Sequence, residues 1–466
     1  MSQETSRSAI VIGGSIAGLL AARVLADYFN HVTIIERDQL PTEAELRAGV
    51  PQGYHAHALM ARGRQIMEAL FPGLEADLLA HGSIQFDMAQ DAQIRFKNGW
   101  AKRIFSDLPV FSMSRALLEG QVRARVLAHP RISVREGYDG LGFTAYGGAV
   151  TGVQLRPRGT QETIFLSADL VVDASGRASK TPDWLQKIGF PTPAETAIDA
   201  FVGYATRWYE IPEDAARDWQ GIWVQSVPPI MPRGGIVLPI EGNRWQVTLF
   251  GIGKDYPPTD DEGFLDFAHS LATKRLYDAI KSAKPLGAVH GYRNTVNRMR
   301  HYDKLARFPE GLIVIGDAYA HFNPTYAQGM TVAALSADAL AQVLKRRPGA
   351  VSGLGREFQK RAAKVLAPAW TMTTTEDLRW ETTVGGTHNL MTRIMHWYTG
   401  SVLALVSEDE EVFKAFLPVQ HMLKPGTALF APSIFRKVIA YTLKQRRQPV
   451  QQTVILATQE LAAVKQ

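Results

Sequence analysis

The chain contains no cysteine. Disulfide bonds, thiolate metal sites, thiol nucleophiles and cysteine-linked cofactors are therefore excluded. No window of the sequence comes near the ~18 uninterrupted apolar residues that a membrane-spanning helix needs. Residues 1–8 are polar and lack the basic start and apolar middle of a signal peptide, so we expect a cytoplasmic protein.

Charge of one sign is not concentrated anywhere. Lys and Arg number 51 and Asp and Glu number 45, and the formal net charge of +6 is spread over the whole chain. Nucleic-acid binding requires a concentrated basic face, so we expect no nucleic-acid partner. The 46% of hydrophobic and 21% of charged residues are the balance of a globular protein and exclude a disordered or fibrous chain.

The first 36 residues have the pattern of one βαβ unit. Buried strands are predicted over 8–12 and 31–35, and an amphipathic helix over 16–29. Between the first strand and the helix lies the sequence Gly13-Gly-Ser-Ile-Ala-Gly18. In such a turn Gly13 permits the sharp bend, Ser15 is small enough to admit a phosphate, and Gly18 lets the helix pack closely on the strand. The helix N-terminus then offers free N–H groups to a pyrophosphate.

Glu36 stands at the end of the second strand, followed by Arg37. A carboxylate at this position accepts hydrogen bonds from both hydroxyls of an adenosine ribose and repels a 2′-phosphate. The pattern therefore favours FAD or NAD over NADP. The alternative is a plain turn with an exposed Glu-Arg pair.

A second strand-to-helix junction lies far along the chain, at Gly316-Asp-Ala-Tyr-Ala-His-Phe-Asn-Pro-Thr-Tyr-Ala-Gln-Gly329. It separates an apolar strand over 311–315 from a helix over 329–346. Asp317 is placed to bind a sugar-like hydroxyl, although it also suits a helix N-cap. The turn from Pro324 to Gly329 would direct backbone N–H groups at an anion or an electron-rich ring. Two such junctions suggest one long cofactor held at both ends.

These motifs resemble those of the FAD-dependent monooxygenases related to p-hydroxybenzoate hydroxylase and squalene epoxidase. The resemblance covers about residues 8–345. It also includes Leu46-Arg-Ala-Gly-Val50, Ser114-Arg115, Asp173-Ala-Ser-Gly-Arg177 and Gly316-Asp317. It implies that Glu36 holds the adenosine ribose and Asp317 the ribityl chain. It also places Arg47 and Arg115 along the FAD, and Pro324 to Gly329 beside the isoalloxazine.

Three departures from that family stand out. Ser15 and Tyr326 replace glycines, and the middle motif reads Asp173-Ala-Ser-Gly176 where the hydroxylases have Asp-Gly, which serves both FAD and NADPH. The electron source therefore stays open between NAD(P)H and a separate flavin reductase. A further segment, Gly49-Val-Pro-Gln-Gly-Tyr-His-Ala-His-Ala-Leu59, is similar to bacterial epoxidases that oxidise polyenes in polyether biosynthesis.

The resemblance implies transfer of one oxygen atom from O2, through a flavin 4a-hydroperoxide, to a small apolar substrate. Attack by an alkene needs no side-chain base, whereas phenol hydroxylation profits from one. Because no dedicated base is evident, epoxidation of a polyene or terpenoid is the favoured reaction. The alternatives are a phenol hydroxylase of the same family, a prenyl reductase and a cyclase. The Trp-x-Trp-x-Ile-Pro pattern of flavin halogenases is absent.

Several further side chains are candidates for the substrate site. His321 lies in the loop beside the expected flavin, where a catalytic role and a structural hydrogen bond are equally favoured. Aromatic residues of the central segment could floor an apolar pocket or belong to an ordinary core. The candidates for the pocket are Trp208, Trp223, Trp245 and Phe322, and Phe250 shares the pattern. At least one of His55 and His57 is expected to have a structural role, and no metal site is predicted.

The expected fold is α/β. Residues 1–180 together with 285–345 would form a Rossmann-like FAD-binding domain, and 181–284 an inserted antiparallel β-sheet substrate domain. Residues 346–466 would form a C-terminal helical region with breaks at Gly385-Gly386, Pro418 and Pro425-Gly426. The basic amphipathic segment 435–447 is compatible with peripheral membrane contact, but a helix packed on its own domain is favoured.

Overall fold

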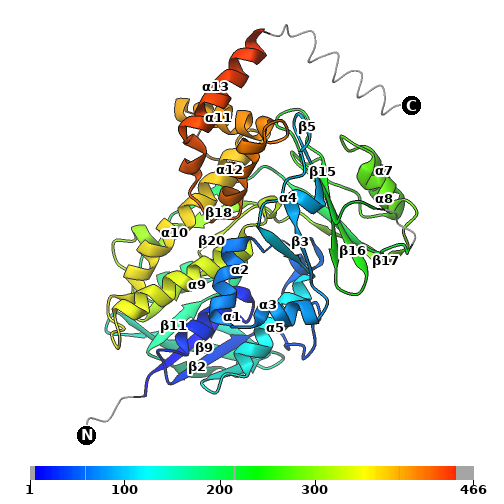
Figure 1. Cartoon of the computed structure of the whole chain (residues 1–466). Coiled ribbons are helices and arrows are strands. Elements are labelled where there is room, and N and C mark those ends of the chain that lie inside the picture. The colour runs from blue at the N-terminus through cyan, green and yellow to red at the C-terminus, as the bar shows by residue number, and fades with distance from the viewer. Residues whose placement is uncertain (1–5, 58, 214–216, 388, 448–466) are drawn as a thin grey trace.

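The computed structural model describes residues 6–57, 59–213, 217–387 and 389–447. A parallel sheet of five strands forms its lower part (Figure 1), in the order β19-β11-β1-β2-β7. Its strands are β1 (Ser8–Ile12), β2 (His31–Glu36), β7 (Ile132–Glu136), β11 (Leu170–Asp173) and β19 (Leu312–Val314). The predicted βαβ unit is thus confirmed.

Strand β11 and the edge strand β19 of this sheet are covered on both faces. Every residue of β11 and β19 is buried, as is expected only where both sides of a parallel sheet are packed. One covering layer is helical, and α1 contacts both α5 and α9. The other covering layer is an antiparallel sheet, in which β8 packs against β2 and β9 against β11. The bounds are α1 (Ile16–Leu25), α5 (Arg115–Leu127), α9 (Gly329–Arg346), β8 (Tyr138–Tyr146), β9 (Ala149–Pro157) and β10 (Ile164–Ser167).

A second sheet of seven strands stands beside the first, in the order β17-β13-β16-β15-β14-β4-β5. Four of its strands come from the segment predicted to be antiparallel: β13 (Gly203–Glu210), β14 (Gly221–Val224), β15 (Gly234–Ile240) and β16 (Arg244–Gly251). Three come from outside the predicted substrate domain: β4 (Ala92–Phe96), β5 (Gly99–Trp100) and β17 (Pro285–Tyr292). β4 runs parallel to β14, a pairing between segments far apart in the sequence.

Alternate residues of the second sheet point to its two faces. On the outer face, Trp245 and Val247 pack with Phe264 and Leu276 of the covering helices α7 (Asp261–His269) and α8 (Arg275–Ile280). The side chains between them point inward, toward the FAD-binding region and the C-terminal helices. This alternation is the reason the sheet can carry both a core and a pocket.

After α9, the described part of the chain contains four more α-helices: α10 (Leu354–Asp377), α11 (Leu390–Val406), α12 (Glu410–Gln420) and α13 (Pro432–Arg447). α10 packs on α9, and the other three form a bundle at the top of the molecule (Figure 1). The predicted breaks at Gly385-Gly386 and Pro425-Gly426 are confirmed, but the one at Pro418 is wrong. Pro418 stands inside α12, two residues before its end, where the chain is about to leave the helix.

Shorter elements connect these layers. They are α2 (Ala61–Leu70), α3 (Leu74–Ala80), β3 (Ile84–Asp87), α4 (Met88–Asp91), β6 (Pro109–Ser112), α6 (Thr181–Lys187), β12 (Glu195–Ile198), β18 (Asn297–Arg300) and β20 (Ala320–His321). The 3-10 turns among the described residues include Pro51–Tyr54, Gly176–Ala178, Gly316–Ala318, Pro324–Tyr326 and Gly426–Phe430. Within the described ranges, no helix combines the length and the apolar character needed to cross a membrane.

Candidate cofactor and substrate site

The glycine turn after β1 has the shape that a dinucleotide requires. Gly13 has φ of +107°, and a Cβ there would lie 2.5 Å from the carbonyl oxygen of Ala174. A Cβ on Gly18 would lie 1.8 Å from the carbonyl oxygen of Gly13. Ser15 is the N-cap of α1, and no side chain caps the helix. The N–H groups of its first turn are therefore free to hold a pyrophosphate.

Glu36 lies buried at the end of β2, beside the glycine turn. Its Oε2 accepts a hydrogen bond from the N–H of Gly14 at 2.7 Å, and its Oε1 accepts from the N–H of Arg37 at 2.8 Å. The Arg37 side chain is more than half exposed, so Arg37 contributes its backbone rather than its charge. These bonds fix the carboxylate at the position where an adenosine ribose would bind.

A buried ionic cluster joins the glycine turn to α5. Glu119 accepts hydrogen bonds from Arg47 Nε at 2.9 Å, from Arg115 Nη2 at 3.0 Å and from the Ser15 hydroxyl at 2.9 Å. Arg47 also pairs with Glu36 at 3.2 Å. Burial raises the pKa of Glu119, but Arg115 and Arg47 outweigh it and leave that pKa below its usual value. The structure thus brings Arg47, Arg115, Ser15 and Glu36 together, and their role along one cofactor stays a prediction.

Glu119 was not predicted from the sequence, although its spacing from Arg115 gives a signal. Glu119 follows Arg115 by four residues on one helix, which is the spacing of an ion pair. The hydroxyl of Ser15, which replaces a glycine of the family pattern, is bonded to Glu119 and Arg115. These bonds hold the Ser15 hydroxyl toward α5, so the side chain does not block the phosphate-binding turn.

Asp173 is a structural carboxylate at the end of β11. It is fully buried and accepts hydrogen bonds from the backbone N–H and hydroxyl of Ser175 and from the hydroxyls of Ser179 and Thr181, at 2.5–2.9 Å. These four donors fix the loop that carries Arg177. Asp173 therefore shapes the site through this loop, and its oxygens are already engaged.

Asp317 behaves differently, because no described residue donates a hydrogen bond to its carboxylate. Burial raises its pKa, while Arg177 and Arg115 oppose that rise. Gly316 precedes it with φ of +64°, and a Cβ there would meet Ala17 of α1 at 2.6 Å. Asp317 thus lies close to the start of α1 with free acceptor atoms. This is the arrangement that a ribityl hydroxyl requires, so the residues fit FAD.

The turn from Pro324 to Gly329 is anchored by a carboxylate of α10. Asp377 accepts hydrogen bonds from Asn323 at 3.0 Å, from the Tyr326 hydroxyl at 2.9 Å and from Asn297 at 2.6 Å. Burial raises the pKa of Asp377 to about 6 despite these three donors. Asp377 and Asn297 were not predicted from the sequence, because nothing in the local pattern marks a carboxylate that is brought in by a distant helix.

Gly329 begins α9, and a Cβ built on it would meet no atom within 4 Å. Ala327 adopts φ of +53°, which completes the turn. Open space in front of Gly329 is consistent with a flat ring lying against this turn. The Tyr326 hydroxyl points to Asp377, so the tyrosine that replaces a family glycine is held by α10.

An apolar pocket lies between this turn and the inner face of the second sheet. Its empty space of about 760 Å³ includes its open side, and most of the side chains that line it are apolar. Its wall is formed by the turn, the sheet, the end of α12 with His421 after it, the first residue of α4 and the segment around His57. Its lining includes Ala56, His57, Met88, Ile94, Tyr204, Trp223, Ile236, Leu238, Thr248, Phe250, Pro324, Ala327, Leu417, Gln420 and His421.

The structure separates the predicted aromatic candidates by sheet face. Trp223 lines the pocket, and so does Phe250. Trp245 points the other way, stacks on Trp219 and belongs to the core, which corrects its prediction as a pocket residue. Trp208 shares the inner face but donates to the carbonyl of Tyr54 and is not among the pocket residues.

Two other candidates also lie outside the pocket. Phe322 packs in the main core with its ring edge against Trp370 of α10. His321 is buried on β20, and burial, together with Arg177 and Arg298, lowers its pKa to about 2. An imidazole with so low a pKa stays neutral and is a poor base, so we assign His321 no catalytic role.

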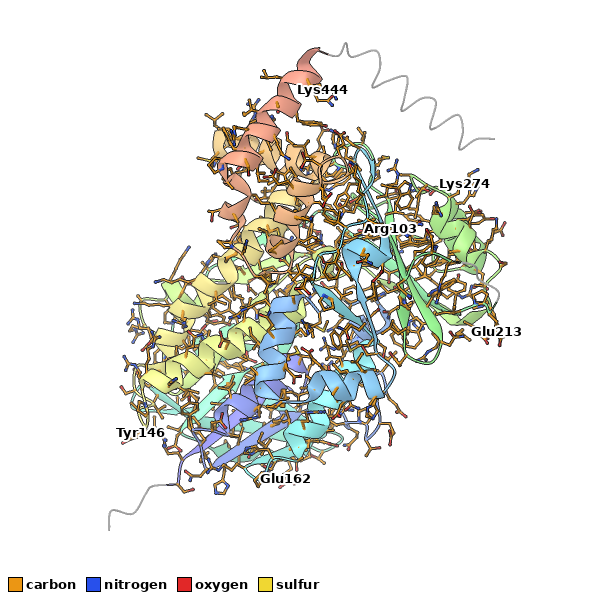
Figure 2. The ribbon with its side chains drawn as sticks, viewed as in Figure 1. Arg103, Tyr146, Glu162, Glu213, Lys274 and Lys444 are labelled. Atoms are coloured by element: carbon orange, nitrogen blue, oxygen red, sulfur yellow. The ribbon has the colours of Figure 1, made fainter. Side chains whose placement is uncertain are left out.

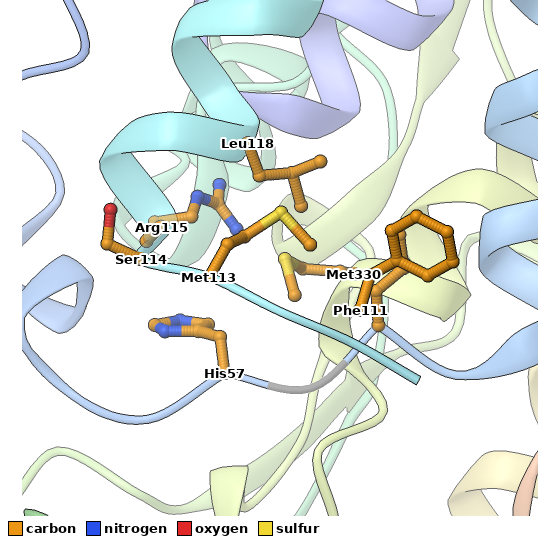
Figure 3. Close-up of a pocket in the computed structure, with 8 residues that line it drawn as sticks. His57, Phe111, Met113, Ser114, Arg115, Leu118 and Met330 are labelled. Atoms are coloured by element: carbon orange, nitrogen blue, oxygen red, sulfur yellow. The ribbon is translucent and has the colours of Figure 1, made fainter. Parts of the chain in front are cut away.

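The two histidines of the segment after Pro51 have different surroundings. His55 is buried and shares a hydrogen bond with Thr206 at 2.8 Å, which is the structural role expected for one of them. His57 lines both the large pocket and a smaller one beside Arg115 (Figure 3). In Figure 3 its ring lies near Met113 and Ser114, at the start of α5. His57 therefore stands between the arginine that borders the cofactor site and the apolar pocket.

Comparison with known proteins identifies the family. The model of the FAD binding domain family matches residues 6–349. Protein Rv3254 of Mycobacterium tuberculosis (strain ATCC 25618 / H37Rv) is 34% identical over 465 residues, which are 95% of this chain and 96% of that protein. The chain belongs to the FAD binding domain family. The family predicted from the motifs is thereby confirmed, and FAD is the cofactor that this flavoprotein's residues fit.

Solved structures show the same fold. The flavin-dependent brominase Bmp2 aligns over 94% of this flavoprotein and 99% of its own chain, with a TM-score of 0.65 and 14% identity. PqsL of Pseudomonas aeruginosa, described as a probable FAD-dependent monooxygenase, aligns over 87% and 98%, with a TM-score of 0.58 and 15% identity. The predicted α/β fold with an added antiparallel sheet and C-terminal helices is therefore confirmed.

Proposed function

We propose that this flavoprotein is an FAD-dependent monooxygenase that transfers one oxygen atom of O2 to an uncharged, apolar organic substrate. The observation that carries the proposal is the apolar pocket beside the turn at Pro324, next to the residues that fit FAD. When bound and reduced, FAD supplies the electrons that activate O2. The side chains of the pocket hold the substrate and exclude water.

The pocket has no ionised group to recognise a charged substrate. None of the described residues that line it is Asp, Glu, Lys or Arg. Burial lowers the pKa of His57 to about 3 and that of His421 to about 4, so both are neutral at pH 7. Burial also raises the pKa of Tyr204 above its usual value, which keeps its hydroxyl protonated. A carboxylate substrate would therefore lose its hydration without gaining a counter-charge.

The same pKa shifts favour an alkene over a phenol as the reacting group. A phenol is hydroxylated faster when a base near pH 7 removes its proton, and a histidine with a pKa of 3 or 4 is a weak base. An alkene is oxidised without proton removal. We therefore infer that epoxidation of a polyene or terpenoid is the reaction, with Trp223, Phe250 and Leu238 positioning the chain.

The experiment is a substrate screen with the purified holoenzyme. Uncharged polyenes, uncharged phenols and their carboxylated analogues are incubated with O2 and NADPH, with and without an added flavin reductase. We expect oxygenated product from the uncharged alkenes only. Turnover of carboxylated substrates alone, or a brominated product when bromide is added, would contradict the proposal. Comparison of the incubations with and without the flavin reductase also shows whether the electrons come from NADPH directly or through a reductase.

A further inference from the structure

The C-terminal bundle exposes a patch of large apolar side chains, which we name the α11–α13 patch. Its members are 39–71% exposed, although residues of these types are normally buried. They come from α11, from the 3-10 turn Gly426–Phe430 and from α13. The patch consists of Leu390, Met391, Ile394, Trp397, Phe430, Phe435 and Leu443.

The spacing of these residues makes the patch continuous along each helix. Leu390, Ile394 and Trp397 recur at intervals of four and three on α11, so they share one face. Phe435 and Leu443 lie two turns apart on α13. Tyr398 joins the two helices, because its ring stacks on Phe430 at 4.2 Å and on Phe435 at 6.1 Å, and Trp397 lies 6.0 Å from it.

The patch is separate from the hydrophobic core of the C-terminal bundle, which other residues of the same helices form. The opposite face of α13 is packed, with Ile434 and Val438 buried together with Val402 and Phe413. The exposed side chains are therefore a second apolar surface on helices that already have a core. Soluble surfaces rarely gather apolar side chains in this way unless the surface binds something.

Basic residues lie around the patch, and several of them have no carboxylate partner among the described residues. The sequence of α13 contains five Lys and Arg residues and no Asp or Glu. Among the described residues, Arg393, Arg436 and Lys444 have no carboxylate partner, whereas Lys437 pairs with Asp409 at 2.6 Å. Lys444 extends from the outer end of α13, away from the rest of the molecule (Figure 2). Apolar and aromatic side chains beside free cations are the composition of helices that lie on an anionic lipid surface.

We propose that the α11–α13 patch docks on the surface of an anionic lipid membrane, with Trp397, Phe430 and Phe435 inserted among the headgroups. A second copy of the chain is a poorer occupant, because a two-fold contact would bring the unpaired cations of both copies together. The proposal does not depend on the reaction. The patch is linked to the substrate pocket by α12, whose Leu417 lines the pocket and which packs against both α11 and α13.

The test is flotation of the full-length holoenzyme with lipid vesicles. Vesicles of phosphatidylcholine alone are compared with vesicles that also contain phosphatidylglycerol, at low and high salt. We expect binding to the anionic vesicles that weakens as salt rises. The variant Trp397→Ser/Phe435→Ser should lower the partition coefficient about tenfold or more, since each ring removes apolar area from the contact. The variant Arg436→Glu/Lys444→Glu should abolish the preference for anionic vesicles.

A matched control uses two aromatic side chains that are exposed elsewhere. Tyr146 and Phe165 are 85% and 67% exposed, and Tyr146 lies at the other end of the molecule from Lys444 (Figure 2). The variant Tyr146→Ser/Phe165→Ser should bind vesicles as the wild type does. Equal binding by all variants, or no binding by the wild type, would overturn the proposal. A dimer in light scattering that Trp397→Ser/Phe435→Ser dissociates, without vesicle binding, would assign the patch to self-association instead.

Discussion

The Tyr326 hydroxyl donates a hydrogen bond of 2.9 Å to Asp377, and this bond ties the turn beside the expected flavin to the C-terminal helix α10. Asn323 and Asn297 bind the same carboxylate from the turn and from β18. Three segments that are distant in the sequence thus meet at one buried group. The helix α10 therefore supports the turn of the proposed flavin site.

Replacing Asp377 with alanine should destabilise the protein and weaken FAD binding. The change leaves the buried donors of Asn297, Asn323 and Tyr326 without an acceptor, at about 1–3 kcal/mol for each donor that water does not reach. Tyr326→Phe removes only one of these bonds and should lower stability by about 1 kcal/mol. Urea unfolding and FAD titration measure the two effects. Equal stability of Asp377→Ala and Tyr326→Phe would show that the carboxylate does not organise the turn.

The same carboxylate should make stability depend on pH in a defined direction. Burial raises the pKa of Asp377 to about 6, above its ordinary value, so the folded state disfavours ionisation. The unfolded chain loses this proton at lower pH, and the contribution of Asp377 to stability therefore falls as pH rises from about 4 to 6. Relative to Asp377→Asn, which does not titrate, the wild type should lose about 3 kcal/mol across this window. Parallel stability curves for the two proteins would contradict the raised pKa.

Asp317 and Asp173 should respond oppositely to the same substitution. Asp317 has free acceptor atoms, so Asp317→Ala should leave the stability of the apoprotein within about 1 kcal/mol and weaken FAD binding tenfold or more, at about 1.5 kcal/mol per bond lost. Asp173 accepts four hydrogen bonds, so Asp173→Ala should destabilise the apoprotein by several kcal/mol. Thermal unfolding without FAD and flavin fluorescence titration separate the two. An unstable Asp317→Ala apoprotein would disprove its role as a ligand.

Trp223 and Trp245 provide a matched pair on opposite faces of one sheet. Trp245→Ala removes a side chain from the core and should lower stability by about 3–5 kcal/mol. Trp223→Ala enlarges the pocket and should raise KM for an apolar substrate about tenfold, with a smaller loss of stability. Chemical denaturation and steady-state kinetics distinguish these outcomes. An unchanged KM for Trp223→Ala would place the substrate elsewhere.

The motifs at strand ends could be predicted from the sequence because each is local. Gly13, Gly18 and Glu36 act within one βαβ unit, so periodicity and spacing locate them. Asp317 was found for the same reason, at the end of an apolar strand. The alternation of β16 also predicted a strand, but it could not show which face meets the pocket, so Trp245 stayed a candidate for the pocket as well as for the core.

The contacts that were missed are those made by distant segments. Asp377 reaches the turn only because α10 packs on α9, and β4 joins the second sheet through a parallel pairing with β14. Leu417 and His421 line the pocket because the last helices fold back over it. No local sequence pattern predicts these contacts, since each of these segments could have the same pattern in another fold.

The most direct test of the central claim is the origin of the oxygen atom in the product. The holoenzyme, an uncharged polyene and a reductant are incubated under O2 labelled with heavy oxygen, and the product is analysed by mass spectrometry. The account predicts an epoxide that contains one labelled oxygen atom. A product whose oxygen comes from water, or a reduced or cyclised product with no added oxygen, would contradict it.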